Sequence, residues 1–485
     1  MERAQVVVVG AGVAGAWAAI EAARAGLEVR LVDEHPLAFS LMASDIPLYF
    51  GQRALPTVAS RGTALARVVA TNPLLQEAEE VGVRLHLGTT VWSSDPDGTL
   101  ALADDTRSWL LRYDHAIFAP GARDLGLAFR GWERAGVLGA GGALALLERY
   151  QAFGGRRVAV LGSGDLGLLV ATRALERGVE GAGGVEVAPQ VRGRAALREP
   201  LERAGVPFYP GHTVKEARGG AEVEALALVR VDGAGRPVPG GEVELACDTV
   251  CLAVGLVPSV ELLSWTGCAL AFRAGRGGFV PVLDDELRST APSIFVAGDA
   301  AGSTEEGFAR PEVAAAQGRL AALAVARSLG VSRAEPPPEL RQQAHAAPAG
   351  DPAARLAYLR AWLASMREAA GGDVTVCLCE EVTARDLEAA TGRGLLHPDH
   401  IKRVTRAGMG PCQGRRCREQ VQLLVAEARG VPVEEVPLAS YRPPFRPLPL
   451  RVVQHQEETP EEREAFLGYW YRRRREEYLR ATGRG

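Results

Sequence analysis

Residues 6–15 read Val-Val-Val-Val-Gly-Ala-Gly-Val-Ala-Gly, and this stretch decides the fold. The run of four valines is typical of a parallel strand that is buried on both faces. Helical spacing follows from Ala14 to about Arg24, and residues 29–33 then alternate into a second strand. A strand, a glycine turn, a helix and a strand in this order predict a dinucleotide-binding α/β unit.

Each glycine of this loop has a physical reason. Gly10 permits the tight turn, Gly12 lets a pyrophosphate approach the backbone, and Gly15 lets the helix pack closely on the strand. The phosphates would face the free N–H groups at the helix N-terminus. Asp33, at the end of the second strand, is placed to accept hydrogen bonds from a ribose, and we count the adjacent Glu34 with the cofactor-binding residues.

A similar unit returns at residues 157–167, where Gly162, Gly164 and Gly167 repeat the spacing. Two features make NAD(P) binding at this loop doubtful. Asp165 lies inside the loop, where a carboxylate would repel a pyrophosphate. The following strand, expected at residues 185–188, ends in alanine rather than in the acid that would hold a ribose.

The composition narrows the class of protein. A chain of 485 residues suggests about three domains at about 150 residues each. A net charge of −4 is too near balance for a general nucleic-acid-binding protein. We expect neither a secretory leader nor a membrane span, and therefore a cytoplasmic protein. The eight histidines are scattered and form no convincing nucleophile–base pair, so the catalytic residues stay unknown.

Four of the seven cysteines form the most specific motif in the chain. They are Cys377 and Cys379, separated by one residue, and Cys412 and Cys417, separated by four. Four thiolates can hold zinc or an iron–sulfur cluster. A gap of one residue is tight for two ligands on one zinc ion, whereas a two-iron cluster takes such a pair more easily, so an iron–sulfur site is favoured. The other three cysteines, Cys247, Cys251 and Cys268, are expected in the core.

Two further segments, residues 113–123 and 293–299, are apolar strands that break at glycine. They resemble the returning strands of flavoproteins with two dinucleotide domains. The resemblance adds Gly121, Gly298 and Asp299 to the cofactor site and implies an FAD domain interrupted by an NAD-type domain. The chain lacks the family's Gly-Gly turn after Glu34, so ATP in the same site stays an alternative.

The sequence around the cysteines, residues 376–383 and 403–414, resembles the [2Fe-2S] domain related to bacterioferritin-associated ferredoxin. The fold class expected for the whole chain is therefore α/β, with two Rossmann-like domains of glutathione-reductase type and a small, mostly helical [2Fe-2S] domain.

Six segments are expected along the chain. They are the first part of the FAD/nucleotide domain (1–124), an inserted NAD-type domain (125–250), the second part of the FAD domain (251–330), a linker with a helix over 353–370 (331–372), the [2Fe-2S] domain (373–430) and a Pro-rich tail with a C-terminal helix (431–485).

As a whole, residues 1 to about 450 resemble the α subunits of multimeric amine and imino-acid dehydrogenases, such as dye-linked L-proline dehydrogenase, opine oxidase, heterotetrameric sarcosine oxidase and hydrogen cyanide synthase. The resemblance implies an electron-transfer subunit with FAD and a [2Fe-2S] cluster. It also implies a flavin-containing β subunit that oxidises the substrate, an FMN at the subunit interface, an electron acceptor and a possible small third subunit.

Two other functions stay open. One is a self-sufficient NAD(P)H-dependent flavoprotein that reduces its own cluster or a ferredoxin-like partner. The other is a non-enzymatic scaffold with ATP and zinc. The C-terminal extension, residues 457–485, is expected to pack on its own subunit or to dock a partner.

Overall fold

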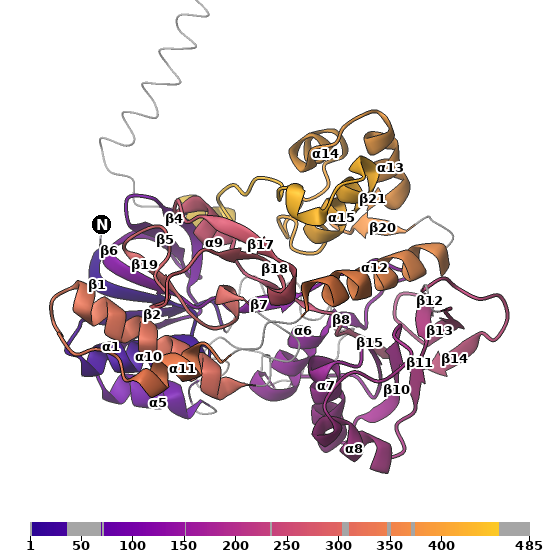
Figure 1. Ribbon diagram of the computed structural model, residues 1–485, viewed down its shortest axis with the longest axis horizontal. Coiled ribbons are helices and arrows are strands. Elements are labelled where there is room, and N and C mark those ends of the chain that lie inside the picture. The colour runs from indigo at the N-terminus through magenta and orange to yellow at the C-terminus, as the bar shows by residue number, and fades with distance from the viewer. Residues whose placement is uncertain are drawn as a thin grey trace, which may run out of the picture.

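The computed structural model describes residues 2–35, 69, 72–150, 152–232, 235–302, 310–346, 351–369 and 374–454. These residues form one module built on a mixed sheet, one built on a parallel sheet, and a small helical module that carries the C-terminal cysteines (Figure 1). The expected C-terminal helix and most of the segment after Glu34 lie outside the described residues.

The first sheet has the strand order β3-β2-β1-β6-β5-β4, and β19 also pairs with β6. Its strands are β1 (Glu2–Val9), β2 (Val29–Asp33), β3 (Arg84–Leu87), β4 (Thr90–Asp95), β5 (Thr99–Ala103), β6 (Ser108–Phe118) and β19 (Ile294–Val296). β1 runs parallel to β2 and β6, and its residues Val6, Val7 and Val8 have no exposed surface. The predicted buried parallel strand is confirmed.

Helices cover one face of this sheet (Figure 1). They are α1 (Val13–Arg24), α5 (Pro73–Glu80), α10 (Pro311–Ser328) and α11 (Pro338–Ala344). α1 begins one residue before the predicted start and ends at the predicted Arg24. α10 crosses α1 closely, because a Cβ on Gly318 would collide with the carbonyl oxygen of Ala14.

The second sheet is parallel throughout, with the order β11-β10-β9-β15-β8. Its strands are β8 (Val137–Gly139), β9 (Arg157–Leu161), β10 (Glu180–Glu186), β11 (Phe208–Pro210) and β15 (Thr249–Leu252). The helices of this module are α6 (Ala140–Leu144), the π-helical turn η2 (Ala145–Arg149), α7 (Asp165–Glu176) and α8 (Ala195–Arg203). An antiparallel sheet adjoins it, made of β12 (His212–Arg218), β13 (Ala225–Arg230) and β14 (Val243–Ala246).

The chain passes between the two modules on a pair of antiparallel strands, β7 (Ala122–Asp124) and β16 (Leu256–Pro258). After β16 it returns to the first module, where β19 pairs with β6. The returning segment contains α9 (Glu261–Trp265), β17 (Leu270–Arg273), η3 (Ala274–Arg276), β18 (Gly278–Pro281) and, after β19, η4 (Gly298–Ala301).

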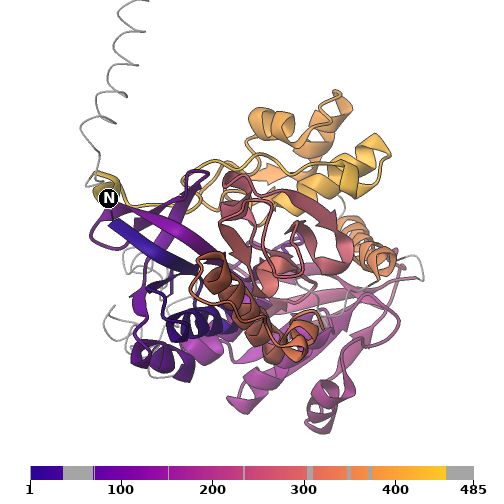
Figure 2. The same cartoon turned by 60° about the vertical axis from the view of Figure 1, so that its left-hand side comes forward.

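The C-terminal third begins with α12 (Pro352–Ala369), which confirms the predicted linker helix. The cysteine module follows, with β20 (Thr375–Cys377), β21 (Val382–Thr383), α13 (Ala384–Gly392), α14 (Pro398–Thr405), α15 (Arg418–Arg429) and η5 (Val433–Glu435). Figures 1 and 2 both place α12 between this module and the second sheet. The tail then runs back to the first sheet, where the Phe445 amide donates to the Trp92 carbonyl at 2.9 Å, and ends in α16 (Leu450–Gln454).

In the described part of the chain, none of the helices combines the length and the apolar character that crossing a membrane requires.

Candidate functional site

The first glycine loop connects β1 to α1 as the spacing predicts. Gly10 has a φ of +104°, and a side chain there would collide with the carbonyl oxygen of Ala119. A Cβ on Gly15 would collide with the carbonyl oxygen of Gly10, so helix and strand touch at this point. Gly12 is the N-cap of α1, and no described atom outside its neighbours lies within 4 Å of the position of a Cβ there. Among the described residues, the loop therefore leaves free the position expected for a pyrophosphate.

The carboxylate of Asp33 lies at the end of β2, beside this loop. Its Oδ2 accepts a hydrogen bond from the Ala11 amide at 2.5 Å, and its Oδ1 accepts one from the His35 amide at 2.7 Å. Glu34 instead pairs with Arg446 of the tail at 2.6 Å. Burial would raise the pKa of Glu34, but Arg446 and its neighbours hold the pKa below its usual range. Asp33 therefore braces the loop, whereas Glu34 ties the tail to the first module.

Gly121, Gly298 and Asp299 lie at the carboxyl ends of the neighbouring strands. Gly121 and Gly298 have φ values of +73° and +71°, and the Gly298 amide donates to Oε1 of Gln317 at 2.8 Å. Gln317 in turn donates to the Ala344 carbonyl at 3.0 Å, which fixes α10 and α11 beside η4. Burial raises the pKa of Asp299 to about 6. The structure thus brings the predicted residues of the first site to one edge of the first sheet.

The second glycine loop repeats the backbone of the first. Gly162 has a φ of +99°, and a Cβ on Gly167 would collide with the carbonyl oxygen of Gly162. Gly164 is the N-cap of α7 in the same extended conformation as Gly12, with φ near −69° in both. The local fold predicted from the glycine spacing is therefore present in both modules.

The prediction that no acid ends the second strand is wrong. β10 begins at Glu180, runs through the glycines at 181, 183 and 184, and ends at Glu186. Glu186 Oε2 accepts hydrogen bonds from the amide and hydroxyl of Ser163 at 3.0 and 2.7 Å, and its Oε1 accepts one from the Ala188 amide at 2.9 Å. Glu186 is 1% exposed, and burial raises its pKa. The acid was missed because the sequence placed the strand end two residues too late.

The prediction that the Asp165 carboxylate would repel a pyrophosphate is also corrected. Its carboxylate is 3% exposed and pairs with Arg194, whose Nε lies 2.6 Å from Oδ2 and whose amide donates to Oδ1 at 2.9 Å. The charge of Asp165 is therefore matched within the protein, and Asp165 holds Arg194 against the loop.

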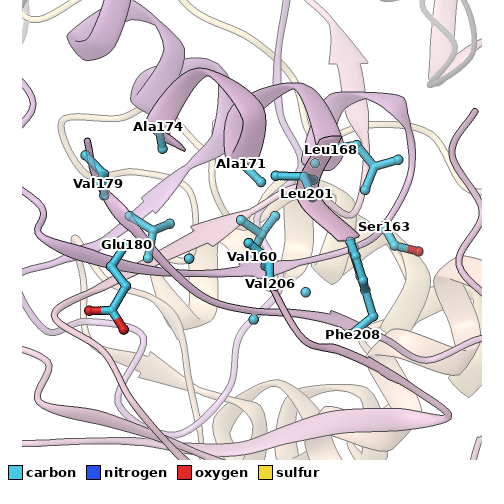
Figure 3. A pocket seen from close by; sticks show the side chains of 16 residues that line it. Val160, Ser163, Leu168, Ala171, Ala174, Val179, Glu180, Leu201, Val206 and Phe208 are labelled. Carbon is cyan, nitrogen blue, oxygen red and sulfur yellow. The ribbon is translucent and has the colours of Figure 1, made fainter. Parts of the chain in front are cut away.

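A pocket lies beneath the second loop, between α7 and strands β9 and β10 (Figure 3). Figure 3 shows the apolar side chains of Val160, Ala171 and Val206 along it, while the carboxylate of Glu180 points away from them. Its volume is about 20 Å³, which is room for a water molecule and far too little for a nucleotide. The pocket exists because several residues of β10 are glycines without side chains, and it is a packing defect of the core.

The four predicted cysteines come together in two pairs. Cys377 lies next to Cys417, and Cys379 lies next to Cys412. The backbone amides of Gly408 and Glu380 lie near the Cys377 thiol and lower its pKa. Among the described residues, no group of three or more His, Cys, Asp or Glu side chains is arranged to hold a single metal ion. The donor set is therefore two adjacent pairs of thiols.

Buried charges fasten the cysteine module to the first module. Arg123, the middle residue of β7, lies 2.5 Å from the carboxylate of Glu419 and 3.6 Å from that of Glu261. Arg123 also donates to the carbonyl oxygen of Arg415, which lies between Cys412 and Cys417 in the sequence. This ion-pair network was missed by sequence reasoning, because Arg123 and Glu419 lie 296 residues apart.

Two hydrogen bonds add to this attachment. Gln420 accepts one from the Ala128 amide at 3.0 Å, and Trp132 Nε1 donates one to the Thr375 carbonyl at 2.7 Å. Both join the segment that follows β7 to the cysteine module, so the module is held at several points along its contact.

The three remaining cysteines are buried, as predicted. Burial raises the pKa of Cys247 to about 12 and that of Cys251 further. Burial likewise raises the pKa of Cys268. These thiols are core residues.

The chain is similar to several known proteins. Residues 4–325 match the family profile of pyridine nucleotide-disulphide oxidoreductases, and residues 372–455 match that of the sarcosine oxidase A3 domain. The opine oxidase A chain of Rhizobium meliloti is 29% identical over 479 residues, covering 92% of this chain and 86% of the relative. Hydrogen cyanide synthase subunit HcnB of Pseudomonas aeruginosa is 28% identical, covering 85% of this chain and 90% of the relative.

Among solved structures, L-proline dehydrogenase from P. horikoshii has the same fold, with a TM-score of 0.61 and 20% identity, over 93% of this chain and 80% of that one. The predicted Rossmann-like architecture is confirmed by this likeness and by the profile. Because the first profile covers two thirds of the chain, the chain belongs to the pyridine nucleotide-disulphide oxidoreductase family and is a flavin-dependent oxidoreductase.

Proposed function

We propose that this chain is the electron-transfer and nucleotide-binding α subunit of a flavin and iron–sulfur dehydrogenase or oxidase that acts on an amine or imino acid. The substrate, of proline, sarcosine, hydroxyproline, opine or glycine type, is oxidised on a partner β subunit with its own flavin. The observation that carries the proposal is the placement of four paired cysteines against the first module, held there by the buried Arg123–Glu419 ion pair. Similarity to the opine oxidase A chain over 92% of this chain supports it.

The first site is assigned to FAD, with ATP as the alternative. Its residues are Gly10, Gly12, Gly15, Asp33, Glu34, Gly121, Gly298 and Asp299. The open backbone at Gly12 suits a pyrophosphate, and Asp33 suits a ribose. Asp299 is an acceptor for hydroxyl groups of the nucleotide, and the tail residue Arg446 holds Glu34 beside them.

The four cysteines suit a [2Fe-2S] cluster better than zinc. Tetrahedral zinc needs four ligands around one point, whereas a two-iron cluster offers each thiol pair its own iron. The backbone amides near Cys377 suit a cluster as well, since hydrogen bonds to sulfur tune its potential. Such a cluster would supply one-electron transfer beside a flavin, which accepts two electrons and releases them singly.

The protein's own residues would position these groups. The Arg123–Glu419 pair and the Trp132–Thr375 hydrogen bond hold the cysteine module on the segment that leaves the first sheet. Arg415 lies 3.4 Å from Glu261 and donates to the Cys412 carbonyl, so it orients the loop between Cys412 and Cys417. Burial of this network keeps bulk water away from the contact between the modules.

The remaining parts of the proposal concern the assembly. We place an FMN at the interface with the β subunit, and we place the complex in the cytoplasm. A separate electron acceptor and a possible small third subunit complete the proposal. The domain division at residues 124, 250, 330, 372 and 430 belongs to the same proposal.

One observation favours a second function, a self-sufficient NAD(P)H-dependent oxidoreductase. Glu186 ends β10 where the ribose acid of an NAD site belongs. The acid is engaged, however, by Ser163 and Ala188 and by the hydroxyl of Tyr358 at 3.3 Å. We therefore rank this function second.

The visible absorption spectrum of the anaerobically purified chain tests the proposal. We expect overlapping flavin and iron–sulfur bands that dithionite bleaches and NADH does not. Rapid bleaching by NADH would support the second function instead. A colourless protein that contains zinc would contradict both and leave a scaffold.

A further inference from the structure

Helix α12 lies along the edge of the second sheet where a dinucleotide would bind. In open α/β sheets, ligands occupy the crevice outside the carboxyl ends of the strands. The hydroxyl of Tyr358, in α12, donates a hydrogen bond to the carboxylate of Glu186 at the end of β10, at 3.3 Å. Arg355 donates to the Val254 carbonyl, just after β15, at 3.1 Å. The two residues are three positions apart and so share one face of the helix, which therefore spans the crevice from β15 to β10.

The helix is anchored as part of the core. Trp362 and Met366 have no exposed surface, and Ser365 donates to the Thr213 hydroxyl of β12 at 2.8 Å. A Cβ on Gly255 would collide with the guanidinium of Arg355, so the glycine at 255 makes room for that side chain. Both ends of the contact thus show a fit between helix and sheet.

A second segment, residues 187–194, closes the crevice from the other side. The guanidinium of Arg192 lies over the ring of Tyr358, 3.9 Å from its centre. The amides of Arg192 and Gly193 donate to the hydroxyl and the carbonyl of Ser163, in the glycine loop, at 3.1 and 2.8 Å. These groups of Ser163 are thereby bonded to protein atoms.

We propose that α12 is a built-in occupant of the second dinucleotide crevice. Tyr358 takes the position of a ribose hydroxyl against Glu186, and Arg355 fills the space at the end of β15. The folded chain therefore excludes NAD(P) from a domain whose glycine loop and acid would otherwise accept it. The inference goes beyond the proposed function, because it holds whether or not the cysteines bind a cluster.

Calorimetric titration of the full chain with NAD⁺, with the first site saturated by its own nucleotide, tests this occupancy. The double variant Arg355→Ala/Tyr358→Ala removes the two side chains that enter the crevice and keeps the anchors at Trp362 and Ser365. We expect its affinity for NAD⁺ to rise at least about tenfold over the wild type, or about 1.4 kcal/mol. Arg360→Ala, on an exposed position of the same helix, should leave the affinity unchanged.

Two results would overturn the proposal. The first is a wild type that binds NAD⁺ as tightly as the double variant. The second is a double variant that keeps its first-site nucleotide and its cooperative unfolding but gains no affinity. Adding Glu186→Gln must abolish the gain; a gain that survives this change belongs to another site and also contradicts the assignment.

If the double variant does not fold, hydrogen exchange of the wild type provides the test. Excess NAD⁺ should leave the exchange of amides 186–194 unchanged. Protection of these amides by NAD⁺ would show that the crevice is open.

Discussion

In the first glycine loop the amide of Ala11 donates to Asp33, and in the second the amide of Ser163 donates to Glu186, so each acid braces its loop in the same way. The surroundings differ. In the described part of the chain, no atom outside its neighbours lies within 4 Å of a Cβ at Gly12, whereas the second loop is covered by Tyr358 and residues 187–194. Glycine spacing and a terminal acid therefore specify a fold, while segments distant in the sequence decide whether a ligand can enter.

The largest expected effect comes from the glycines that let helix and strand touch. Gly15→Ala and Gly167→Ala each place a Cβ against a carbonyl oxygen of the preceding turn. Each should lower the free energy of unfolding by about 2–4 kcal/mol. Only Gly15→Ala should also lose its bound nucleotide. The nucleotide that each purified variant retains is measured in the supernatant after denaturation. Loss of nucleotide from Gly167→Ala would contradict the difference between the modules.

A smaller effect is expected at the two N-cap glycines. Gly12 and Gly164 have extended backbones that any residue adopts, so alanine should change the free energy of unfolding by less than about 1 kcal/mol at either position. At Gly12 the new methyl group would stand where the pyrophosphate belongs and should weaken nucleotide binding about tenfold. Gly164→Ala is the matched control, and equal losses of affinity would mean that both loops bind nucleotide.

The smallest effect concerns Asp299, a carboxylate of the first module. Burial raises its pKa to about 6, whereas an unfolded aspartate titrates near about 3.9. Between these values the folded chain holds the extra proton, so the free energy of unfolding falls as the pH rises from about 4 to 6. In nucleotide-free protein this fall in the free energy of unfolding should be on the order of 1 kcal/mol, because water still reaches part of the Asp299 side chain. Asp299→Asn should remove it.

Denaturant unfolding at several pH values checks this prediction, with Glu312→Gln on an exposed position of α10 as the control. Identical pH profiles for the wild type and Asp299→Asn would show that Asp299 is not the titrating group.

Local patterns allowed the sequence to predict much of the fold. The valine run, the helix after it and the linker helix 352–369 depend on periodicity and glycine spacing within one segment. The cysteine motif was equally clear, because its residue types and gaps are unusual in a core.

Other features depend on contacts that no local pattern carries. The end of β10 was misplaced because the strand ends where its pairing with β11 ends, at Glu186 opposite Pro210. The contact of Tyr358 with Glu186 joins positions 172 residues apart, and no local spacing predicts it. The motif also did not predict which cysteines form pairs, since this follows from the helices between them.

Cofactor analysis of the anaerobically purified full chain tests the central claim most directly. After denaturation, the released nucleotides are separated, and iron, acid-labile sulfide and zinc are measured per chain. We expect about one FAD, about two iron atoms with about two sulfides, and no NAD(P). A second nucleotide per chain, or zinc in place of iron, would contradict it.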